Sequence, residues 1–440
     1  MGAWYVRLDA VQGMSRAVIL LDGIFSIISI AACRLAFRVI REGGNDWLRR
    51  NPKSKDAAII GAGNLGAALI RELQTQKNGL NPVVIFDDNA KKHGTYIHGL
   101  PVVGPIEELG TRGGSVEEVI VAAPSMAGDR VTKVLTITQE LGLKCRTVPS
   151  LSQLASGAVV SSLRPVEIDD ILSRDVVDLK TDGYSEFFAG KTIMVTGAGG
   201  SIGSDLCRQL ARMKLKTLVM VDNSEAALFE VCSELYAEVD VVTQLADVQD
   251  RQLMEDVFKQ NQPDIVFHAA AYKHVGLLER QPLAAVKTNI LGTHTAAVLA
   301  KKIGVDQFVL VSTDKAVDPS SIMGASKCIA ERLMEGHSLE TGGTTFISVR
   351  FGNVLGSSGS VVPIFQRQIE AGGPVTVRDK QATRFFMSIP EAAGLILASA
   401  AIGSNGDRFI LDMGEPVKIM DLAEQMIQLS GKSSGKDISI

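Results

Sequence analysis

Three consecutive side chains that can move protons follow one apolar segment of the chain. Thr313, Asp314 and Lys315 come directly after FVLVS (308–312), a run that predicts a buried strand. A carboxyl group and an amine side by side can act as acid and base, and a hydroxyl can relay a proton. These residues are therefore the candidate catalytic group, and the surrounding elements must bring a substrate to this strand end.

A glycine-rich turn upstream has the spacing of a dinucleotide-binding motif. The strand TIMV leads into TGAGGSIG, a GxxGxxG turn before a helix that begins near Ser201. Glycines let backbone amides approach a pyrophosphate, whose charge the helix N-terminus stabilises. The residues expected to bind the dinucleotide here are Gly197, Gly200, Ser201, Ile202 and Gly203.

An acidic residue at the next strand end indicates which dinucleotide binds. TLVMV ends at Asp222, 19 residues after Gly203. A carboxylate there would bind a ribose hydroxyl and repel a 2′-phosphate, which favours NAD over NADP. Asp247 is placed to reach the adenine, and two alanines after the strand IVFH are small enough for the cofactor to lie against the backbone. Together with a neighbouring valine, these further cofactor contacts are Asp247, Val248, Ala269 and Ala270.

The alternation of strands and helices predicts an α/β fold with two tandem Rossmann-like domains, each a doubly wound parallel sheet. The first covers residues 57–150, where AAII precedes Gly61, Gly63 and Gly66, and Asp87 follows 21 residues after Gly66. A polar connecting segment (151–190) leads to the catalytic domain (191–440). Whether the first domain binds a ligand or serves as a scaffold stays open.

The chain begins with a segment that predicts membrane attachment. Residues 17–40 are largely apolar, and Asp22 is the sole charge in 17–32. We expect an N-terminal segment (1–16), a transmembrane helix (17–40) and a linker (41–56). Basic residues dominate after the helix, which places the catalytic domain on the cytoplasmic side of the cytoplasmic membrane. A signal peptide and an interfacial amphipathic helix are the alternatives.

Composition excludes several other classes of protein. Apolar residues make up 46% and charged residues 21%, which is typical of a globular chain rather than a disordered one. A net charge of −4 gives no reason to expect a nucleic-acid partner. The five cysteines form no CxxC motif and the histidines no HExxH motif, so we expect a reduced cytosolic domain without a metal site.

The motifs TGAGGSIG, HAAAYKHV, STDKAV, MGASK, VRFGNVLGSSGSVVPIF and TRFFMS together resemble the extended short-chain dehydrogenase/reductases. More narrowly, they resemble the membrane-anchored nucleotide-sugar 4,6-dehydratases of bacterial polysaccharide and glycan synthesis. The resemblance covers nearly the whole chain. Members of this family have several membrane helices and a longer catalytic domain, so it implies a chain shortened at both ends. It also implies a UDP-sugar substrate, with UDP-N-acetylglucosamine preferred, and a homo-oligomer.

The resemblance also implies roles for the candidate residues. Where the superfamily carries Tyr-x-x-x-Lys, this sequence has Met323 and Lys327. Lys327 would hold the nicotinamide ribose, whereas methionine cannot transfer a proton. In the implied cycle a hydride leaves carbon 4, Lys315 removes the carbon 5 proton, and Asp314 protonates the departing 6-hydroxyl. The hydride then returns to carbon 6. For the proton of the 4-hydroxyl, Thr313 is the candidate relay, toward solvent or Lys327.

Four residues are expected to contact the substrate. Lys273 and His274 would line the sugar pocket, and Asn353 resembles the substrate-contacting asparagine of the family. Arg384 suits a diphosphate, because a guanidinium binds phosphate oxygens in pairs. A nucleotide-sugar 4-epimerase remains an alternative, because it shares the 4-keto step. A non-catalytic, membrane-tethered nucleotide-binding protein is a second alternative, which Met323 makes plausible.

Overall fold

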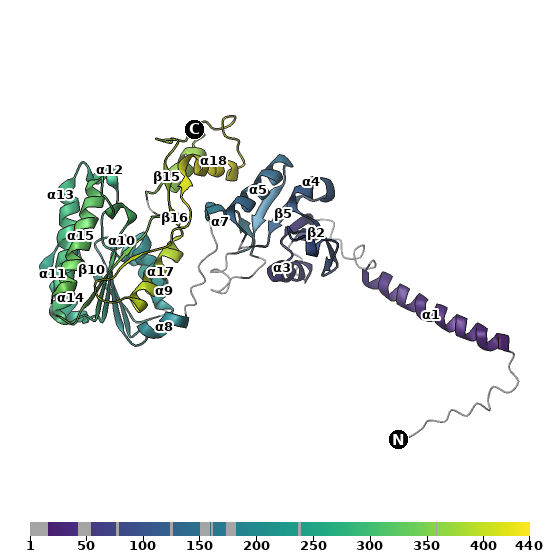
Figure 1. The fold of residues 1–440 in the computed structure, drawn as a ribbon, viewed down its shortest axis with the longest axis horizontal. Coiled ribbons are helices and arrows are strands. Elements are labelled where there is room, and N and C mark those ends of the chain that lie inside the picture. Colours follow the sequence, from purple (N-terminus) through teal and green to yellow (C-terminus); the bar gives the residue numbers. More distant parts are fainter. Residues whose placement is uncertain are drawn as a thin grey trace, which may run out of the picture. The chain divides into compact units, whose positions relative to one another are not determined.

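The computed structural model describes residues 16–42, 54–75, 79–123, 126–149, 159, 162–172, 182–235, 239–340, 342–357 and 359–440. The chain forms two compact units (Figure 1). Unit 1 comprises Met1–Pro124 and Ile137–Pro165, and unit 2 comprises Ser125–Thr136 and Val166–Ile440.

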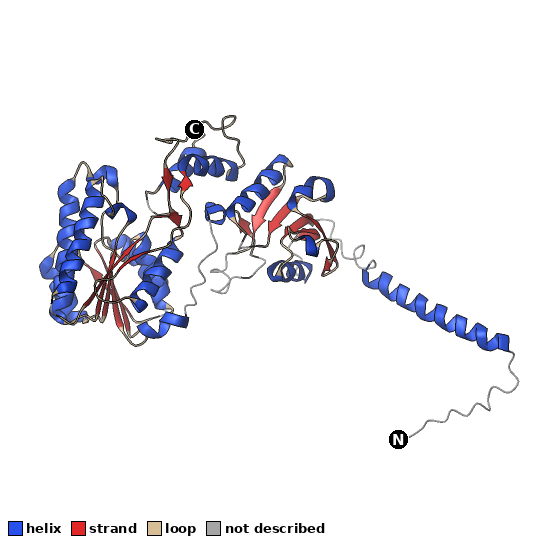
Figure 2. Cartoon of the chain, viewed as in Figure 1, coloured by secondary structure: helices blue, strands red, loops and turns tan. Residues whose placement is uncertain are grey.

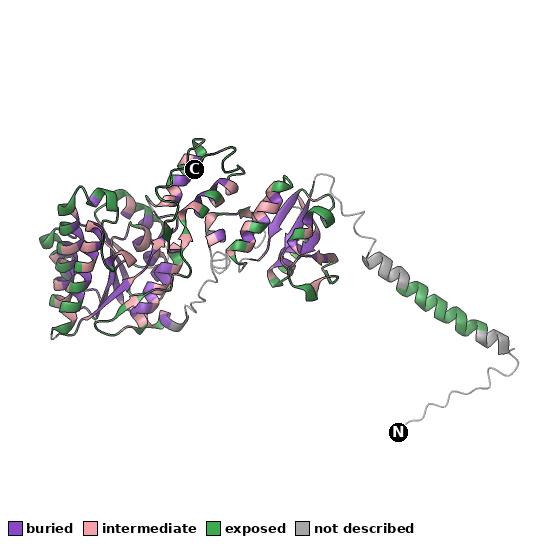
Figure 3. Ribbon diagram, turned by 45° about the horizontal axis from the view of Figure 1, so that its top comes forward, coloured by how far each residue is buried: buried purple, intermediate pink, exposed green. Residues whose placement is uncertain are grey.

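Helix α1 (Arg16–Glu42) lies where a transmembrane helix was predicted. Its described side chains, residues 21–34, are all exposed (Figure 3). Within the described part of the chain, no helix is long and apolar enough to cross a membrane. The predicted helix is therefore present, whereas its membrane-spanning role is not confirmed. Most of the predicted N-terminal segment and of the predicted linker lies outside the described residues.

Seven described strands of unit 1 form one sheet in the order β3-β4-β2-β1-β5-β6-β7. The central strands are parallel, and β3 and β7 pair antiparallel at the two edges. The strands are β1 (Lys55–Ile60), β2 (Leu80–Phe86), β3 (Tyr96–Ile97), β4 (Leu100–Gly104), β5 (Glu118–Val121), β6 (Lys144–Thr147) and β7 (Arg164–Pro165). Helix α3 (Asn64–Thr75) and the short helix α4 (Leu109–Arg112) accompany this sheet, whereas α5 (Gly128–Glu140) begins in unit 2 and ends in unit 1.

Seven described strands of unit 2 form an all-parallel sheet in the order β10-β9-β8-β11-β12-β13-β17. The strand order reverses beside β8, as in a doubly wound sheet, and ligands bind at the strand ends near such a point. This confirms the predicted fold class for the catalytic domain. The strands are β8 (Thr192–Thr196), β9 (Thr217–Asp222), β10 (Val241–Leu245), β11 (Ile265–His268), β12 (Gln307–Val311), β13 (Thr345–Arg350) and β17 (Arg408–Ile410).

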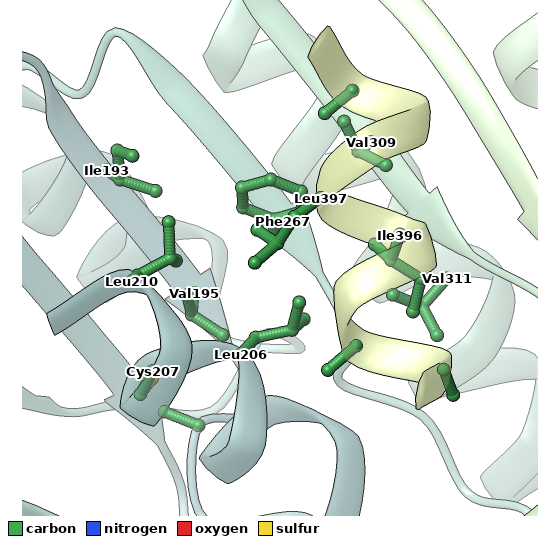
Figure 4. Packing of buried hydrophobic residues seen from close by; sticks show 14 of the residues in the cluster. Ile193, Val195, Leu206, Cys207, Leu210, Phe267, Val309, Val311, Ile396 and Leu397 are labelled. Carbon is green, nitrogen blue, oxygen red and sulfur yellow. The ribbon is translucent and has the colours of Figure 1, made fainter. Parts of the chain in front are cut away.

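Helices cover both faces of this sheet (Figure 2). Side chains of each strand alternate between two apolar clusters: Val195 packs with Leu206 and Ile396 on one face (Figure 4), and Met194 packs with Ala296 on the other. Such strands are apolar on both faces, as parallel strands between helices must be. The helices of the first face are α8 (Asp182–Phe188), α9 (Ser201–Ala211), α10 (Glu225–Leu235) and α17 (Ile389–Ile402). Those of the second are α11 (Arg251–Asn261), α14 (Thr293–Ile303) and α15 (Ile322–Leu339).

A smaller part of unit 2 has its own apolar core. Helices α16 (Val361–Glu370) and α18 (Ile419–Leu429) pack together there. Two short ladders accompany them, the parallel pair β14–β16 and the antiparallel pair β15–β18. These strands are β14 (Asn353–Val354), β15 (Thr383–Arg384), β16 (Phe386–Met387) and β18 (Val417–Lys418). The part therefore carries Asn353 and Arg384, two of the predicted substrate residues.

The predicted connecting segment is more regular than its composition suggested. Within its described residues it contains β7, α7 (Ile168–Leu172) and α8. Tyr184 and Phe188 lie one turn apart on α8 and are buried in the core of unit 2, where their rings meet edge to face. Burial of two aromatic rings on one helix face stabilises a helix that charged neighbours obscure in the sequence.

Candidate active site

The glycine turn between β8 and α9 packs directly against the chain that follows β11. Gly197 has a φ of +70°, and a Cβ atom there would lie 2.7 Å from the backbone nitrogen of Ala270. A Cβ atom at Gly203 would overlap the carbonyl oxygen of Gly197. Neither position has room for a side chain, so only glycine fits there, and the backbone of the turn comes close to Ala269 and Ala270. Ser201 and Ile202 begin α9, with Gly200 as its N-cap.

Two carboxylates lie at the strand ends beside this turn. Asp222 accepts hydrogen bonds from the backbone N–H of Gly199 at 2.8 Å and from that of Ser224 at 2.9 Å. Asp247 accepts one from the side-chain amide of Asn223 at 3.1 Å. Asn223 therefore links the end of β9 to the second carboxylate, a role that the sequence motif did not reveal.

Val248, beside Asp247, is buried. It lies under Gly292, where an added Cβ would come within 2.8 Å of a Val248 methyl group. The predicted cofactor residues thus lie around the carboxyl ends of the strands of the unit 2 sheet. Their arrangement fits a dinucleotide, because the glycine turn has no side chain that would keep a pyrophosphate from the start of α9 and a carboxylate ends the neighbouring strand β9.

The candidate catalytic group occupies a short 3₁₀ turn (Asp314–Ala316) that Thr313 caps. Lys315 Nζ lies 2.9 Å from Asp314 Oδ1 and donates to Asn353 Oδ1 at 2.9 Å. The Thr313 hydroxyl donates to the same Asp314 oxygen at 2.9 Å. The turn is fixed to the neighbouring strand, since the Asp314 N–H donates to the Phe351 carbonyl at 2.9 Å. Predicted catalytic and substrate residues therefore meet in one cluster.

Helix α15 reaches this turn at its N-terminal end. Ser321 caps the helix by accepting the Gly324 N–H. Any side chain at Gly324 would overlap the Lys315 carbonyl oxygen, so α15 and the 3₁₀ turn are in close contact. Met323, on the first turn of α15, is 4% exposed and packs with Leu278 and Ala285 in an apolar cluster.

Lys327 lies one turn further along α15 and is almost fully buried. Its ammonium donates to the carbonyl of Val311, the last residue of β12, at 2.7 Å. Burial lowers the pKa of Lys327 to about 8, although the nearby carboxylate of Glu331 opposes the shift. Lys327 is thus held at the strand end from which the candidate catalytic group projects.

The remaining predicted substrate residues are less closely joined to the cluster. Lys273 and His274 follow β11 and are exposed, and partial burial lowers the pKa of Lys273. The His274 ring lies against Gly359, where a Cβ atom would overlap it. Arg384 is exposed and donates to the adjacent Thr383 carbonyl at 2.7 Å.

Sequence reasoning missed Asn289, which is fully buried in a π-helix (Val286–Gly292). Its side chain accepts the Tyr272 N–H at 2.8 Å and donates to the Tyr272 carbonyl at 2.9 Å. It also donates to Ser326 Oγ at 2.9 Å. Asn289 therefore fixes the loop that carries Lys273 beside α15. The signal was an asparagine directly before the apolar residues Ile290 and Leu291.

His268, the last residue of β11, is a second buried polar residue that was missed. Burial lowers its pKa to about 3, so the ring is neutral at ordinary pH. Its two nitrogens lie 2.8 Å from Thr196 Oγ1 and 3.0 Å from Thr293 Oγ1. The ring thus links β8 and β11 to α14 beneath the glycine turn.

Unit 1 repeats the turn geometry, with one difference in charge. Any side chain at Gly66 would overlap the Gly61 carbonyl, and the Ala62 N–H donates to Asp87 Oδ2 at 2.7 Å. The corresponding bond in unit 2 joins Gly199 to Asp222. In unit 1, however, Lys92 Nζ also lies 3.0 Å from the Asp87 carboxylate. The acid at this strand end is therefore already paired with a cation.

Comparison with known proteins agrees with this architecture. Residues 193–440 match the family described as "Polysaccharide biosynthesis protein", and residues 3–149 match one described as "CoA-binding domain". The capsular polysaccharide biosynthesis protein CapD of Staphylococcus aureus is 40% identical over 423 residues, which cover 94% of this chain and 70% of CapD. The chain belongs to the polysaccharide biosynthesis protein family.

Solved structures share a fold with more than half of this chain. Pen from Bacillus thuringiensis is 32% identical, with a TM-score of 0.54 over 57% of this chain and 80% of that one. DesIV of Streptomyces venezuelae, a dTDP-glucose 4,6-dehydratase solved with NAD, is 21% identical with a TM-score of 0.52, over 56% of this chain and 83% of DesIV. The second likeness is one of fold alone.

Proposed function

We propose that this protein is an NAD-dependent nucleotide-sugar 4,6-dehydratase, with UDP-N-acetylglucosamine as its substrate. The observation that carries the proposal is the direct pairing of Asp314 and Lys315 at the carboxyl end of β12. A plain dehydrogenase has no use for such a pair, whereas loss of water needs both a base at carbon 5 and an acid at carbon 6. Membership of the polysaccharide biosynthesis family supports a sugar substrate.

The cofactor would lie along the carboxyl edge of the unit 2 sheet. The glycine turn would bind its pyrophosphate, Asp222 a ribose hydroxyl, and Asp247 its adenine end. Lys327, held at the end of β12, would contact the nicotinamide ribose. When bound there, NAD⁺ accepts a hydride from carbon 4 of the sugar and returns it to carbon 6.

Transfer of one proton within the ion pair of Lys315 and Asp314 would give the protonation states that catalysis needs. Lys315 must be a neutral amine and Asp314 a protonated acid, and their atoms lie 2.9 Å apart. Movement of one proton from Lys315 Nζ to Asp314 Oδ1 gives both forms without changing the net charge of the pair. A bound sugar that excludes water would favour these uncharged forms, because burial penalises charges. Asn353 would orient the amine toward carbon 5.

The 4-hydroxyl proton needs a separate path, because Met323 cannot accept it. The Thr313 hydroxyl donates to Asp314 Oδ1 at 2.9 Å. Because Asp314 already holds the proton from Lys315, Thr313 would relay the 4-hydroxyl proton toward solvent. Asp314 then gives a proton to the departing 6-hydroxyl, which leaves as water. Lys315 returns a proton to carbon 5 when carbon 6 is reduced, and one proton from solvent restores the Asp314–Lys315 pair, so the cycle balances.

Product analysis tests the proposal against its alternatives. The full chain would be incubated with NAD⁺ and UDP-N-acetylglucosamine, and the nucleotide sugars identified by mass spectrometry and NMR. We expect a product that has lost one water and carries a 6-methyl and a 4-keto group. A 4-epimer of unchanged mass would instead establish the epimerase. Tight NAD binding with no change in any UDP-sugar would favour the non-catalytic binding protein.

Contact of α1 with a membrane is the second part of the proposal. Its large apolar side chains are exposed, for example Phe25 at 71% and Ile27 at 70%. A run of such residues marks a surface that another apolar phase covers. We expect the full chain to float with liposomes, and Phe25→Asp with Ile28→Asp to abolish flotation. The control Ser29→Asp adds charge at a polar position and should float, whereas unchanged flotation of the double variant would contradict the proposal.

A further inference from the structure

A buried carboxylate lies behind the candidate site and is used by none of the proposed steps. Glu331, on α15, is 2% exposed. Arg350 donates to it twice, from Nε at 2.8 Å and from Nη2 at 2.5 Å. The Ser312 hydroxyl donates at 2.5 Å, and Arg408 Nε lies 3.5 Å away. These four residues are called the Glu331 cluster.

Three of the four residues in the cluster belong to segments that carry a proposed site residue. Ser312 immediately precedes Thr313, and Arg350 ends β13 three residues before Asn353. Glu331 itself lies one helical turn after Lys327 on α15. Residues four apart on a helix share a face, so the carboxylate and the Lys327 ammonium lie on the same side of α15. One carboxylate therefore joins the three segments that surround the proposed reaction.

We infer that Glu331 is a positioning residue: its buried carboxylate fixes α15, the end of β12 and the end of β13 in register, so that Lys327, the Asp314–Lys315 pair and Asn353 meet. The inference rests on the proposed function for the reaction that it supports. Glu331 touches neither substrate nor cofactor in this account and acts through Ser312 and Arg350.

The chemistry of the cluster suits this role. A paired guanidinium–carboxylate contact is planar and directional, so it restricts how β13 can slide relative to α15. The Ser312 bond adds a third fixed direction toward β12. Loss of the negative charge would leave the partly buried Arg350 without its counter-charge, which would disturb all three segments together. A shift of about 1 Å at a reacting group is enough to slow catalysis about 100-fold.

The matched experiment compares Glu331→Gln with Glu255→Gln. Glu255, on α11, also contacts two cations, Lys259 at 2.9 Å and Lys302 at 2.6 Å, but lies outside the cluster. For the dehydration we expect Glu331→Gln to lower kcat about 10- to 100-fold and to change KM less than about threefold. Glu331→Asp keeps the charge and should recover part of the loss, and Glu255→Gln should match the wild type. A folded Glu331→Gln with wild-type kcat would overturn the inference.

A second variant covers the case in which Glu331→Gln does not fold. Ser312→Ala removes one hydrogen bond and keeps the Arg350 contact, so the chain should fold with a midpoint close to that of the wild type. We expect kcat to fall about three- to tenfold at unchanged KM, as the loss of one hydrogen bond in a network predicts. Unchanged kcat in this variant would also overturn the inference.

Affinity for NADH separates failure of the inference from failure of the proposed function. If the wild type binds NADH but dehydrates no sugar, the proposed function fails, while the position of Lys327 can still be read from binding. We then expect Glu331→Gln to weaken NADH binding about tenfold relative to Glu255→Gln, as one lost charge-assisted contact predicts. Equal NADH affinity in the two variants, or no NADH binding by the wild type, would overturn the positioning role.

Discussion

Lys315 and Asn353 lie 38 positions apart in the sequence and share a hydrogen bond of 2.9 Å between Nζ and Oδ1. The bond joins the end of β12 to β14, and the same ammonium contacts Asp314. Lys315 is therefore oriented by one charged and one neutral oxygen. A neutral amide orients an amine without opposing the loss of its proton, which a base at carbon 5 requires.

Substitution of Asn353 tests this arrangement. Asn353→Asp keeps the size and the acceptor oxygen but adds a second negative charge, which stabilises the ammonium form of Lys315. We expect Asn353→Asp to lower kcat about 100-fold or more, and Asn353→Ala only about tenfold, because Ala removes orientation without adding charge. Steady-state rates for the two variants provide the measurement. An Asp variant more active than the Ala variant would contradict the role of Asn353.

Removal of the acid and removal of the base should affect the reaction in different ways. Lys315→Met removes the base, so we expect neither solvent exchange of the carbon 5 proton nor 6-deoxy product. Asp314→Asn removes the acid while leaving an amine, so carbon 5 exchange should continue while elimination slows about 100-fold or more. Both quantities can be followed in one NMR experiment in deuterated water. Normal turnover by Lys315→Met would exclude Lys315 as the base.

Alanine substitutions at two glycines of the turn test its backbone geometry. Alanine at Gly197 must adopt a φ of +70° and meet backbone atoms at 2.7–2.8 Å. We expect Gly197→Ala to destabilise unit 2 by about 2 kcal/mol or more and to abolish NAD binding. Gly200→Ala is the matched control, because Gly200 has a φ of −75° and its new Cβ meets only the Gly197 carbonyl at 3.2 Å. Thermal melting and NAD titration would compare them, and an equal loss in both variants would contradict the geometry.

The buried Lys327 makes stability depend on pH in a defined direction. Its pKa is lowered from 10.5 to about 8, so between these values the unfolded chain binds more protons than the folded one. Stability should therefore rise with pH in this interval and show the full cost of the buried charge below it. Relative to Lys327→Met, the wild type should gain about 3 kcal/mol between about pH 7 and about pH 10.5. Parallel melting curves across that range would contradict the shift.

The local motifs of the site could be predicted from the sequence because each one lies within a few residues. TGAGGSIG predicts a strand, a turn and a helix, and the structure places β8 and α9 there. The alternation of strands and helices likewise predicted the parallel sheet of unit 2. The identities of Asp314 and Lys315 also came from adjacency, although their direct pairing did not, because rotamers depend on neighbours.

Contacts between distant segments could not be predicted in the same way. The bond from Lys315 to Asn353 depends on how β14 continues beyond β13, which no single segment specifies. Glu331 looks like an exposed helix residue in the sequence, and only the register of α15 against Arg350 buries it. Asn289 was missed for a similar reason, since Tyr272, to which its side chain bonds, lies in another segment of the chain.

The most direct test of the proposed dehydratase is an NMR time course of the purified full chain with UDP-N-acetylglucosamine and NAD⁺ in deuterated water. The account predicts a UDP-linked 4-keto-6-deoxy sugar that carries deuterium at carbon 5, because Lys315 exchanges its proton with solvent before the hydride returns. A product with a 6-hydroxymethyl group still present, or a 6-deoxy product with no deuterium at carbon 5, would contradict the acid–base pair of Asp314 and Lys315.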